Sequence, residues 1–170
     1  MKNPVSHGVK IAKFELIERM NLFSKKYLSE DELKSLSAVI AEAEKTTSGE
    51  IRVALRHRRS WKERSLSLHE LALQEFRRLG MEKTHGRTGV LIMLLLSERK
   101  FQIIADEGIH KKVEDGTWDQ IAGRMSAQFK AGRFADGITD AIREVGGVLS
   151  LHFPRKNDDR DELSNQIVEK

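Results

Sequence analysis

Two apolar runs in the middle of the chain are separated by a short polar segment. Val90 to Leu96 contains only apolar residues, and Phe101 to Ala105 is mostly apolar, with Ser97 to Lys100 between them. The first run is too short to cross a membrane and is typical of a strand that is buried on both faces of a sheet. The pattern predicts two strands that pair back on each other through a turn.

A further strand is predicted upstream, from Glu50 to about His57. Between this strand and the apolar hairpin lies a helical segment with the inward positions Leu68, Ala72, Phe76 and Leu79. This order predicts a right-handed β-α-β crossover with its two strands parallel. The expected fold class is α/β, with three α/β/α layers around a mixed central sheet of about four strands, formed by one β-α-β crossover plus a β-hairpin. The sequence does not place the fourth strand, for which a short edge strand is expected.

Two capping boxes mark expected helix starts. Ser29 to Glu32 opens a helix with Leu33, Leu36, Ile40 and Ala43 on its core face, and Ser60 to Glu63 is expected to open the crossover helix. Gly80 suits the position just after that helix. Two later helices are expected, one from Thr117 to Gly132 and one from Phe134 to about His152.

These patterns divide the chain into three parts. One helical face carries apolar residues near the start of the chain, so residues 1–28 are expected to form an N-terminal amphipathic helical extension: Val9, Ala12, Leu16, Ile17 and Met20. Residues 29–154 form the α/β domain. Residues 155–170 form a charged C-terminal tail that is expected to be disordered or loosely docked, with apolar contacts available at Leu163, Ile167 and Val168.

Composition narrows the class of protein. A chain of 170 residues suits one domain, and the absence of cysteine excludes disulfides, thiolate catalysis and zinc-thiolate sites. No secretory signal is visible in Met1 to Lys13, and no run approaches the length of a membrane span, so a cytoplasmic protein is expected. A net charge of +4 is mild: it allows contact with anions but does not require nucleic acid, which is not expected as a partner.

Five short motifs occur in an order that resembles the TPM domain family. They are T-x-G-E-I-x-V at Thr47 to Val53, F-x-x-L-G at Phe76 to Gly80, G-V-L-I at Gly89 to Ile92, an arginine and an isoleucine at Arg99 and Ile103, and G-I at Gly108 and Ile109. The resemblance covers roughly Asp31 to Phe153. It implies partners among membrane proteins or other TPM-domain proteins, and a location peripheral to the inner face of the membrane for a chain without a span of its own.

The resemblance also implies a divalent-cation site at one end of the sheet, because members of the family have been reported to bind calcium and to hydrolyse phosphate monoesters. Glu50, Asp106 and Glu107 are the carboxylates available to a calcium ion there. Typical relatives have Asp-Asn-Gly before the second strand, whereas this chain has Arg87, Thr88 and Gly89. The cation at position 87 is expected to pair with Glu50 or Asp106 and to block the metal site.

Basic residues gather at the opposite end, which is the carboxyl edge of the parallel strands. A cluster that could bind an anion consists of Arg56, His57, Arg58, Arg59 and Lys62. Open α/β sheets commonly bind ligands at this edge, and a helix N-terminus there would add amide donors. Trp61 is the only aromatic residue in the loop, which disfavours recognition of single-stranded nucleic acid by stacking.

Complete catalytic motifs are absent from the sequence. There is no G-x-S-x-G elbow, P-loop or G-x-G-x-x-G motif, and the His69-Glu70 pair lacks the second histidine of a zincin helix. Three hypotheses stay open: an accessory or interaction module that assists assembly, repair or regulation of membrane-associated proteins; a divalent-metal-dependent, phosphatase-like hydrolase of at best weak activity; and anion or nucleic-acid backbone binding through the loop from Arg56 to Arg64.

Overall fold

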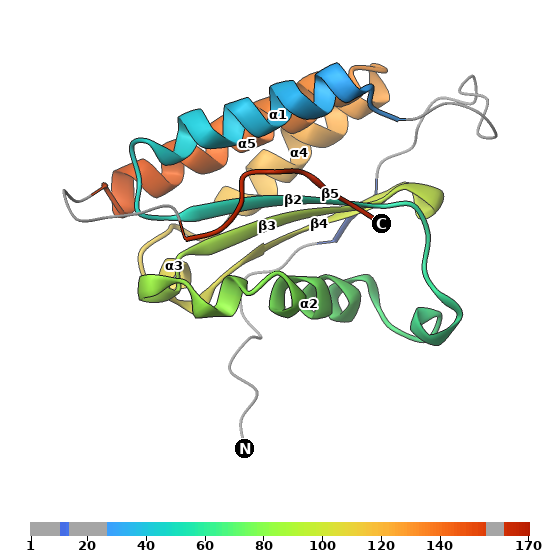
Figure 1. Ribbon diagram of the computed structural model, residues 1–170, viewed down its shortest axis with the longest axis horizontal. Helices are drawn as coiled ribbons and strands as arrows, with labels where there is room; N and C mark the ends of the chain where they lie inside the picture. Colours follow the sequence, from blue (N-terminus) through green and yellow to red (C-terminus); the bar gives the residue numbers. More distant parts are fainter. Residues whose placement is uncertain (1–10, 14–26, 156–161) are drawn as a thin grey trace.

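A five-stranded sheet lies between two helical layers in the computed structural model, which describes the backbone of residues 11–13 and all of residues 27–155 and 162–170 (Figure 1). The strand order is β1-β4-β3-β2-β5. Helices α1 (Glu30–Glu44), α4 (Thr117–Lys130) and α5 (Phe134–His152) cover one face, and α2 (Leu68–Arg78) covers the other. The short helix α3 (Glu107–His110) follows β4. The three-layer α/β/α prediction is therefore confirmed.

Three long strands form the centre of the sheet: β2 (Glu50–Arg56), β3 (Gly89–Leu95) and β4 (Lys100–Ala105). β2 and β3 are parallel, and β3 and β4 are antiparallel, as predicted from the crossover and the hairpin. Every residue of β3 is buried, because helices cover both faces of this central strand.

The two remaining strands are short and lie at the edges. β1 (Ile11–Lys13) pairs with β4, so the predicted N-terminal helix is wrong at these three residues, where backbone pairing with an open sheet edge takes precedence over the helical pattern. The other positions of that helix lie outside the described residues. β5 (Val168–Glu169) pairs in parallel with β2, and the segment 162–170 is therefore docked on the domain.

Side chains alternate between two apolar clusters along the strands. Ile51, Val53 and Leu55 of β2 belong to the cluster under α1, α4 and α5, whereas Ala54 belongs to the cluster under α2. The same alternation predicts that Arg52 and Arg56 point toward the α2 face. Both arginines are buried, which requires that this face carry partners for charge.

Capping chemistry places the helix starts. At Ser29 the capping box forms as predicted, with a 2.7 Å hydrogen bond from the Ser29 amide to Glu32. At Ser60 the prediction is wrong, because this box opens only the 3₁₀ turn η1 (Trp61–Glu63), and α2 begins at Leu68 after a third capping box at Ser67. Arg59 explains the interruption, since its guanidinium donates to the carbonyl groups of Glu63 and Leu66.

The later helices begin and end close to the predicted residues. α4 ends near Gly132 and α5 ends at His152. Gly80 adopts a left-handed conformation (φ 73°) just after α2, as the helix-stop prediction requires. None of the helices within the described ranges is long and apolar enough to cross a membrane.

Gly146 lets α5 approach α1 closely. A Cβ atom at Gly146 would lie 2.7 Å from the Cβ of Ala43, whereas one at Gly147 would meet nothing within 4 Å. We expect Gly146→Ala to lower the free energy of unfolding by about 1–2 kcal/mol, because overpacking exceeds the gain in helix propensity. Gly147→Ala, as the matched control, should raise it by about 0.5–1 kcal/mol. Urea unfolding measures both, and equal shifts would contradict the close approach.

Candidate functional site

The acidic end of the sheet is organised by an ion pair between Arg87 and Asp106. Arg87 donates from Nε to Oδ2 and from Nη2 to Oδ1 of Asp106, both at 2.8 Å. The Asp106 carboxylate is 1% exposed, and its Oδ1 also accepts the amide of Glu107 at 2.7 Å. These hydrogen bonds to Asp106 raise the pKa of Arg87 above its usual value. The predicted pairing of Arg87 is therefore present, with Asp106 as the partner.

Backbone conformation places this pair. The 3₁₀ turn η3 (His85–Arg87) carries two left-handed residues, Gly86 (φ 78°) and Arg87 (φ 58°). Helix α3 packs directly on the turn, because a Cβ at Gly108 would lie only 2.1 Å from the carbonyl oxygen of Gly86. Gly108 therefore allows the contact that brings Arg87 to Asp106.

The three predicted metal ligands do not form one group. Glu50 and Asp106 flank Gly89 from opposite sides, because Glu50 is its partner in β2 and Asp106 bonds its carbonyl, so their backbones lie about 10 Å apart. Glu107 is exposed and pairs with Lys111 at 3.5 Å. In the part of the chain that the structure describes, no three histidine, aspartate or glutamate side chains are grouped to hold a metal ion. With both oxygens of Asp106 bonded to Arg87, this arrangement does not fit calcium.

A residue from the far end of the chain joins this end of the sheet. The amide of Glu162 donates to Oε1 of Glu50 at 2.7 Å, and the Glu162 carboxylate accepts the amide of His85 at 2.9 and 3.1 Å. The contact of Glu162 could not be predicted from the sequence, because nothing in a charged tail indicates which of its acids binds to the domain.

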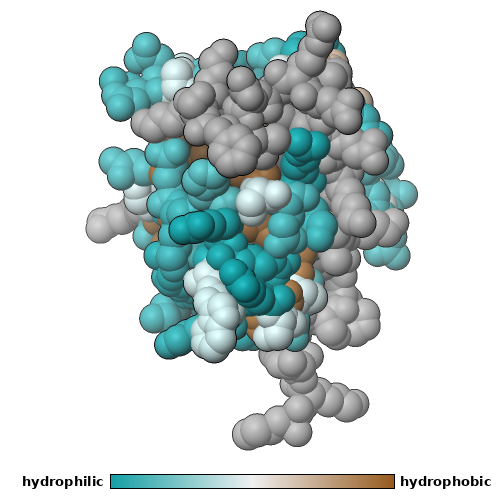
Figure 2. Space-filling view, turned by 90° about the vertical axis from the view of Figure 1, so that its right-hand side faces the viewer, coloured by the Kyte–Doolittle hydropathy of each residue, from teal (hydrophilic) through white to brown (hydrophobic). Residues whose placement is uncertain are grey.

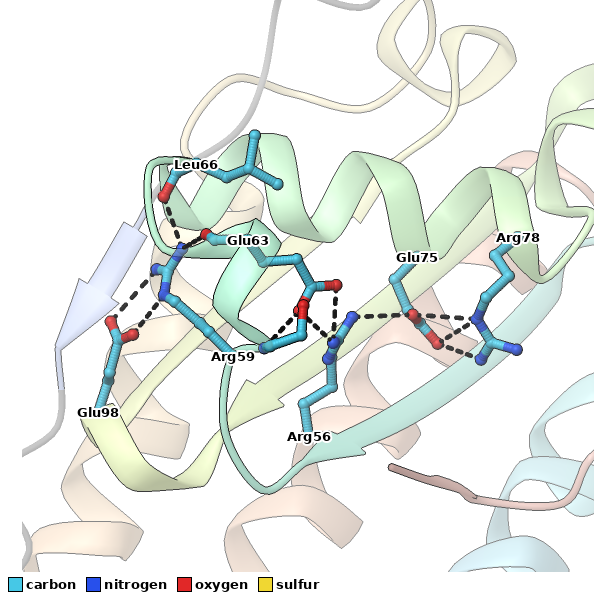
Figure 3. Close-up of polar contacts among 8 residues, drawn as sticks. Arg56, Arg59, Glu63, Leu66, Glu75, Arg78 and Glu98 are labelled. Carbon is cyan, nitrogen blue, oxygen red and sulfur yellow. Dashed lines mark hydrogen bonds and ion pairs between the residues drawn. The ribbon is translucent and has the colours of Figure 1, made fainter.

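At the basic end, Arg56 lies in a buried network of charges under α2 (Figure 3). Its Nη2 donates to both oxygens of Glu63 at 2.9 and 2.8 Å, and its Nη1 donates to Glu75 at 3.4 Å. The Glu75 side chain is 1% exposed and also accepts from Arg78. Arg56 is therefore neutralised inside the protein and is not available to an external anion.

Arg59 is engaged in a similar way. Its guanidinium pairs with Glu98 in the β3–β4 turn, and hydrogen bonds from Arg59 lower the pKa of Glu98 (Figure 3). Of the five predicted anion-binding residues, two thus hold the loop in place. The other three, His57, Arg58 and Lys62, are exposed.

The loop surface is strongly hydrophilic apart from one aromatic side chain. Figure 2 shows this end of the molecule, where the coloured residues are mostly hydrophilic and apolar colour is confined to small areas. Trp61 is 78% exposed, and its neighbours Arg58, Lys62 and Arg64 are exposed as well. Within residues 27–155 and 162–170, no ion pair involves these three cations. We call Arg58, Trp61, Lys62 and Arg64 the basic loop.

The acids that hold this loop in place are not predicted from the sequence. The sequence pattern indicates only a capping role for Glu63, and Glu75 lies on the inward face of α2, where it is buried. The position of Glu75 is a signal in the sequence for a buried acid. Glu75 is four residues after Leu71 and one before Phe76, on an otherwise apolar helix face. A buried acid on such a face requires a buried cation opposite it.

Glu63 gives this network a measurable pH dependence. Burial opposes its ionisation, but hydrogen bonds from the Ser60 amide and hydroxyl and from Arg56 outweigh burial and lower the pKa of Glu63 to about 2. A lowered pKa adds stability above the unfolded value near 4.5, which is lost as the pH falls toward 2.

We expect Glu63→Gln to be less stable than wild type by about 2 kcal/mol at pH 7 and by progressively less as the pH falls from 4.5 to 2. Urea unfolding across this range measures the difference. Glu114→Gln, at an exposed position in the loop before α4, is the control and should run parallel to wild type. A constant difference between wild type and Glu63→Gln would contradict the assignment.

Comparison with known proteins identifies the family. The TPM domain model matches residues 23–148, and the chain therefore belongs to the TPM domain family. The NMR structure of the BA42 protein from the psychrophilic bacterium Bizionia argentinensis is 36% identical, with a TM-score of 0.77, over 86% of this chain and 97% of that one. No curated protein sequence matches the chain.

A second solved structure shares the fold. The N-terminal domain of a protein from P. gingivalis is 21% identical, with a TM-score of 0.62, over 77% of this chain and 83% of that one. At this identity the similarity concerns the arrangement of helices and strands alone.

Proposed function

We propose that this TPM domain is an accessory module that binds partner proteins and assists the assembly, repair or regulation of membrane-associated proteins. The observation that carries the proposal is the contrast between the two kinds of charge at the basic end. Arg56 and Arg59 form ion pairs inside the protein. The cations of the basic loop, in contrast, are exposed and flank the exposed Trp61.

The ion pairs favour binding because they hold the loop in one conformation. Arg59 binds the carbonyl groups of Glu63 and Leu66, and Arg56 at the end of β2 binds the Glu63 carboxylate, so the C-terminal end of η1 is attached to the sheet. A preorganised tryptophan with flanking cations loses little entropy on binding, and tryptophan and arginine are the residues that most often dominate protein interfaces. The partner surface should be acidic, with an apolar depression for the indole.

Co-sedimentation with membranes from the cells that contain this protein tests the proposal. Wild type should sediment with native membranes and lose most of this binding after the membranes are stripped by protease. Trp61→Ser should weaken binding at least tenfold, while Leu151→Ser should not, because Leu151 is equally exposed (77%) but lies on α5. Equal binding of wild type and Trp61→Ser would overturn the proposal, and binding to protein-free anionic vesicles or to nucleic acid with a steep salt dependence would replace it with anion binding.

A second candidate is a divalent-metal-dependent, phosphatase-like hydrolase, supported by the name of the matching family model, TPM phosphatase. The acids Glu50, Asp106 and Glu107 lie at one end of the sheet, but Arg87 donates hydrogen bonds to both carboxylate oxygens of Asp106. Metal binding would therefore require that Arg87 leave this position.

Thermal unfolding with millimolar calcium, magnesium or manganese tests this candidate. We expect no shift in wild type, because Arg87 neutralises Asp106, and a shift of roughly 5–10 °C in Arg87→Asp, where a third acid joins Asp106 and Glu107. Arg87→Gln, which removes the cation without adding an acid, is the control and should shift less. A shift in wild type that is lost in Glu50→Ala would favour the hydrolase, and no shift in any variant would remove it.

A further inference from the structure

The outer edge of β2 is covered by a short segment of the same chain. In Figure 1, residues 162–170 run beside β2 and end next to its C-terminal end. The segment is attached at Glu50 through the amide of Glu162, and at Ala54 and Leu55 through Val168 and Glu169. The amide of His57 donates to the carbonyl of Lys170 at 2.6 Å, and the amide of Lys170 donates to the carbonyl of Leu55 at 2.9 Å.

Residues 162–170 pair with only a small part of the β2 edge. β2 has seven residues, whereas β5 has two, so most of the edge is not paired with β5. Where β5 does not reach, the outward amide of Ile51 is satisfied by the Glu44 side chain at 2.8 Å. A strand edge that is paired along only part of its length is a template for another strand.

The segment also packs imperfectly. A hollow of about 360 Å³ remains between the segment and α1, lined by Leu33, Lys34, Ser37, Gln166 and Ile167. Oδ1 of Asn165 is buried without a hydrogen-bond partner in the described part of the chain, and so is Nε of Arg52, which lies on β2 between the two attachment points. Buried polar atoms without partners weaken the docked state.

We propose that the outer edge of β2 is a strand-binding site for an extended segment of a partner protein, and that residues 162–170 occupy this site in cis. The docked segment shows which chemistry fits. Ile167 and Val168 contact the apolar clusters on opposite sides of the sheet, and Glu169 follows them at an exposed position. The partner segment should therefore have two successive apolar residues followed by an acid, and it should add to β2 in parallel.

This inference rests on the proposed function as a partner-binding module and names a second contact, distinct from the basic loop. It also makes binding competitive, because the partner must displace the segment in cis. The apparent affinity for a partner is reduced by the fraction of molecules in which the edge is covered.

A peptide exchange assay with the full chain tests the inference. The probe is a fluorescein-labelled peptide with the sequence of residues 162–170, and its binding is followed by fluorescence anisotropy. Full-length Ile167→Asp/Val168→Asp should bind this peptide at least tenfold more tightly than wild type, because its own segment competes poorly. A peptide that carries the same two aspartates is the control and should not bind either chain.

A disulfide that holds residues 162–170 on β2 tests the opposite case, in which the segment cannot leave the edge. The chain has no cysteine, so Ala54→Cys/Val168→Cys places a single thiol pair at positions that are partners in the β2–β5 register. Oxidation should abolish peptide binding, and reduction should restore it. Two results together would overturn the inference. The first is that Ile167→Asp/Val168→Asp binds the peptide no better than wild type. The second is that the His57 amide of wild type exchanges its hydrogen with solvent as slowly as the amides of β3. Since the assay uses only purified protein and peptide, failure of the membrane assay would count against the proposed function alone.

Discussion

Replacing Arg56 by alanine should lower the free energy of unfolding by about 3–5 kcal/mol, which corresponds to a fall in Tm of roughly 10 °C. The reason is that the Glu75 side chain, 1% exposed, would lose one of its two cations, and Glu63 would lose both hydrogen bonds from Nη2. A buried charge without its partner costs far more than the pair contributes. Calorimetry or urea unfolding measures the effect.

Two controls separate burial from charge. Arg124→Ala breaks an ion pair with Glu144 on the surface, where the arginine side chain is 55% exposed, and should cost less than about 1 kcal/mol. Arg56→Met/Glu75→Met removes both buried charges and should be more stable than Arg56→Ala, because no uncompensated carboxylate remains at position 75. Similar losses in Arg56→Ala and Arg124→Ala would show that the network under α2 is not buried in solution.

Gly108→Ala should be the most damaging single methyl addition among the glycines described. Its Cβ would lie 2.1 Å from the carbonyl oxygen of Gly86 and 2.7 Å from that of Arg87, and both are backbone atoms that cannot rotate away. We expect a loss of more than about 3 kcal/mol, because α3 must separate from η3 to make room. Thermal unfolding measures the loss.

The control for this variant is Gly123→Ala in α4, where a Cβ would meet nothing within 4 Å and helix propensity should raise stability slightly. A second readout follows Arg87 itself. Separation of α3 from η3 should weaken the pairing of Arg87 with Asp106, so that the two substitutions Gly108→Ala and Arg87→Ala together cost less than the sum of their separate effects. Additive effects would mean that Gly108 does not position the ion pair.

The central sheet could be predicted from the sequence because β3 is an uninterrupted apolar run and β4 is mostly apolar. Val90 to Leu96 reads as a strand buried on both faces, and the crossover rule then fixes β2 parallel to β3. The edge strands could not be predicted in the same way. β1 and β5 have three and two residues, and such lengths carry no period, so their pairing depends on the open backbone groups of β4 and β2.

Only one of the charge pairs at the two ends of the sheet, that of Arg87, could be predicted from the sequence. The pairing of Arg87 followed from opposite charges at one end of the sheet, since topology alone brings position 87 close to position 106. The neutralisation of Arg56 and Arg59 could not be predicted, because Glu63, Glu75 and Glu98 come from three different elements and only packing selects them as partners. A run of basic residues therefore indicated more free positive charge than the folded protein exposes.

The left-handed backbone at Arg87 has an evolutionary consequence. Arginine is uncommon at φ 58°, whereas aspartate and asparagine tolerate this conformation well. An exchange between arginine and aspartate at this position can therefore invert the charge without any change in the path of the chain. One substitution could therefore reverse the sign of the charge at this end of the sheet on an unaltered scaffold, so a shared fold among relatives does not imply a shared ligand there.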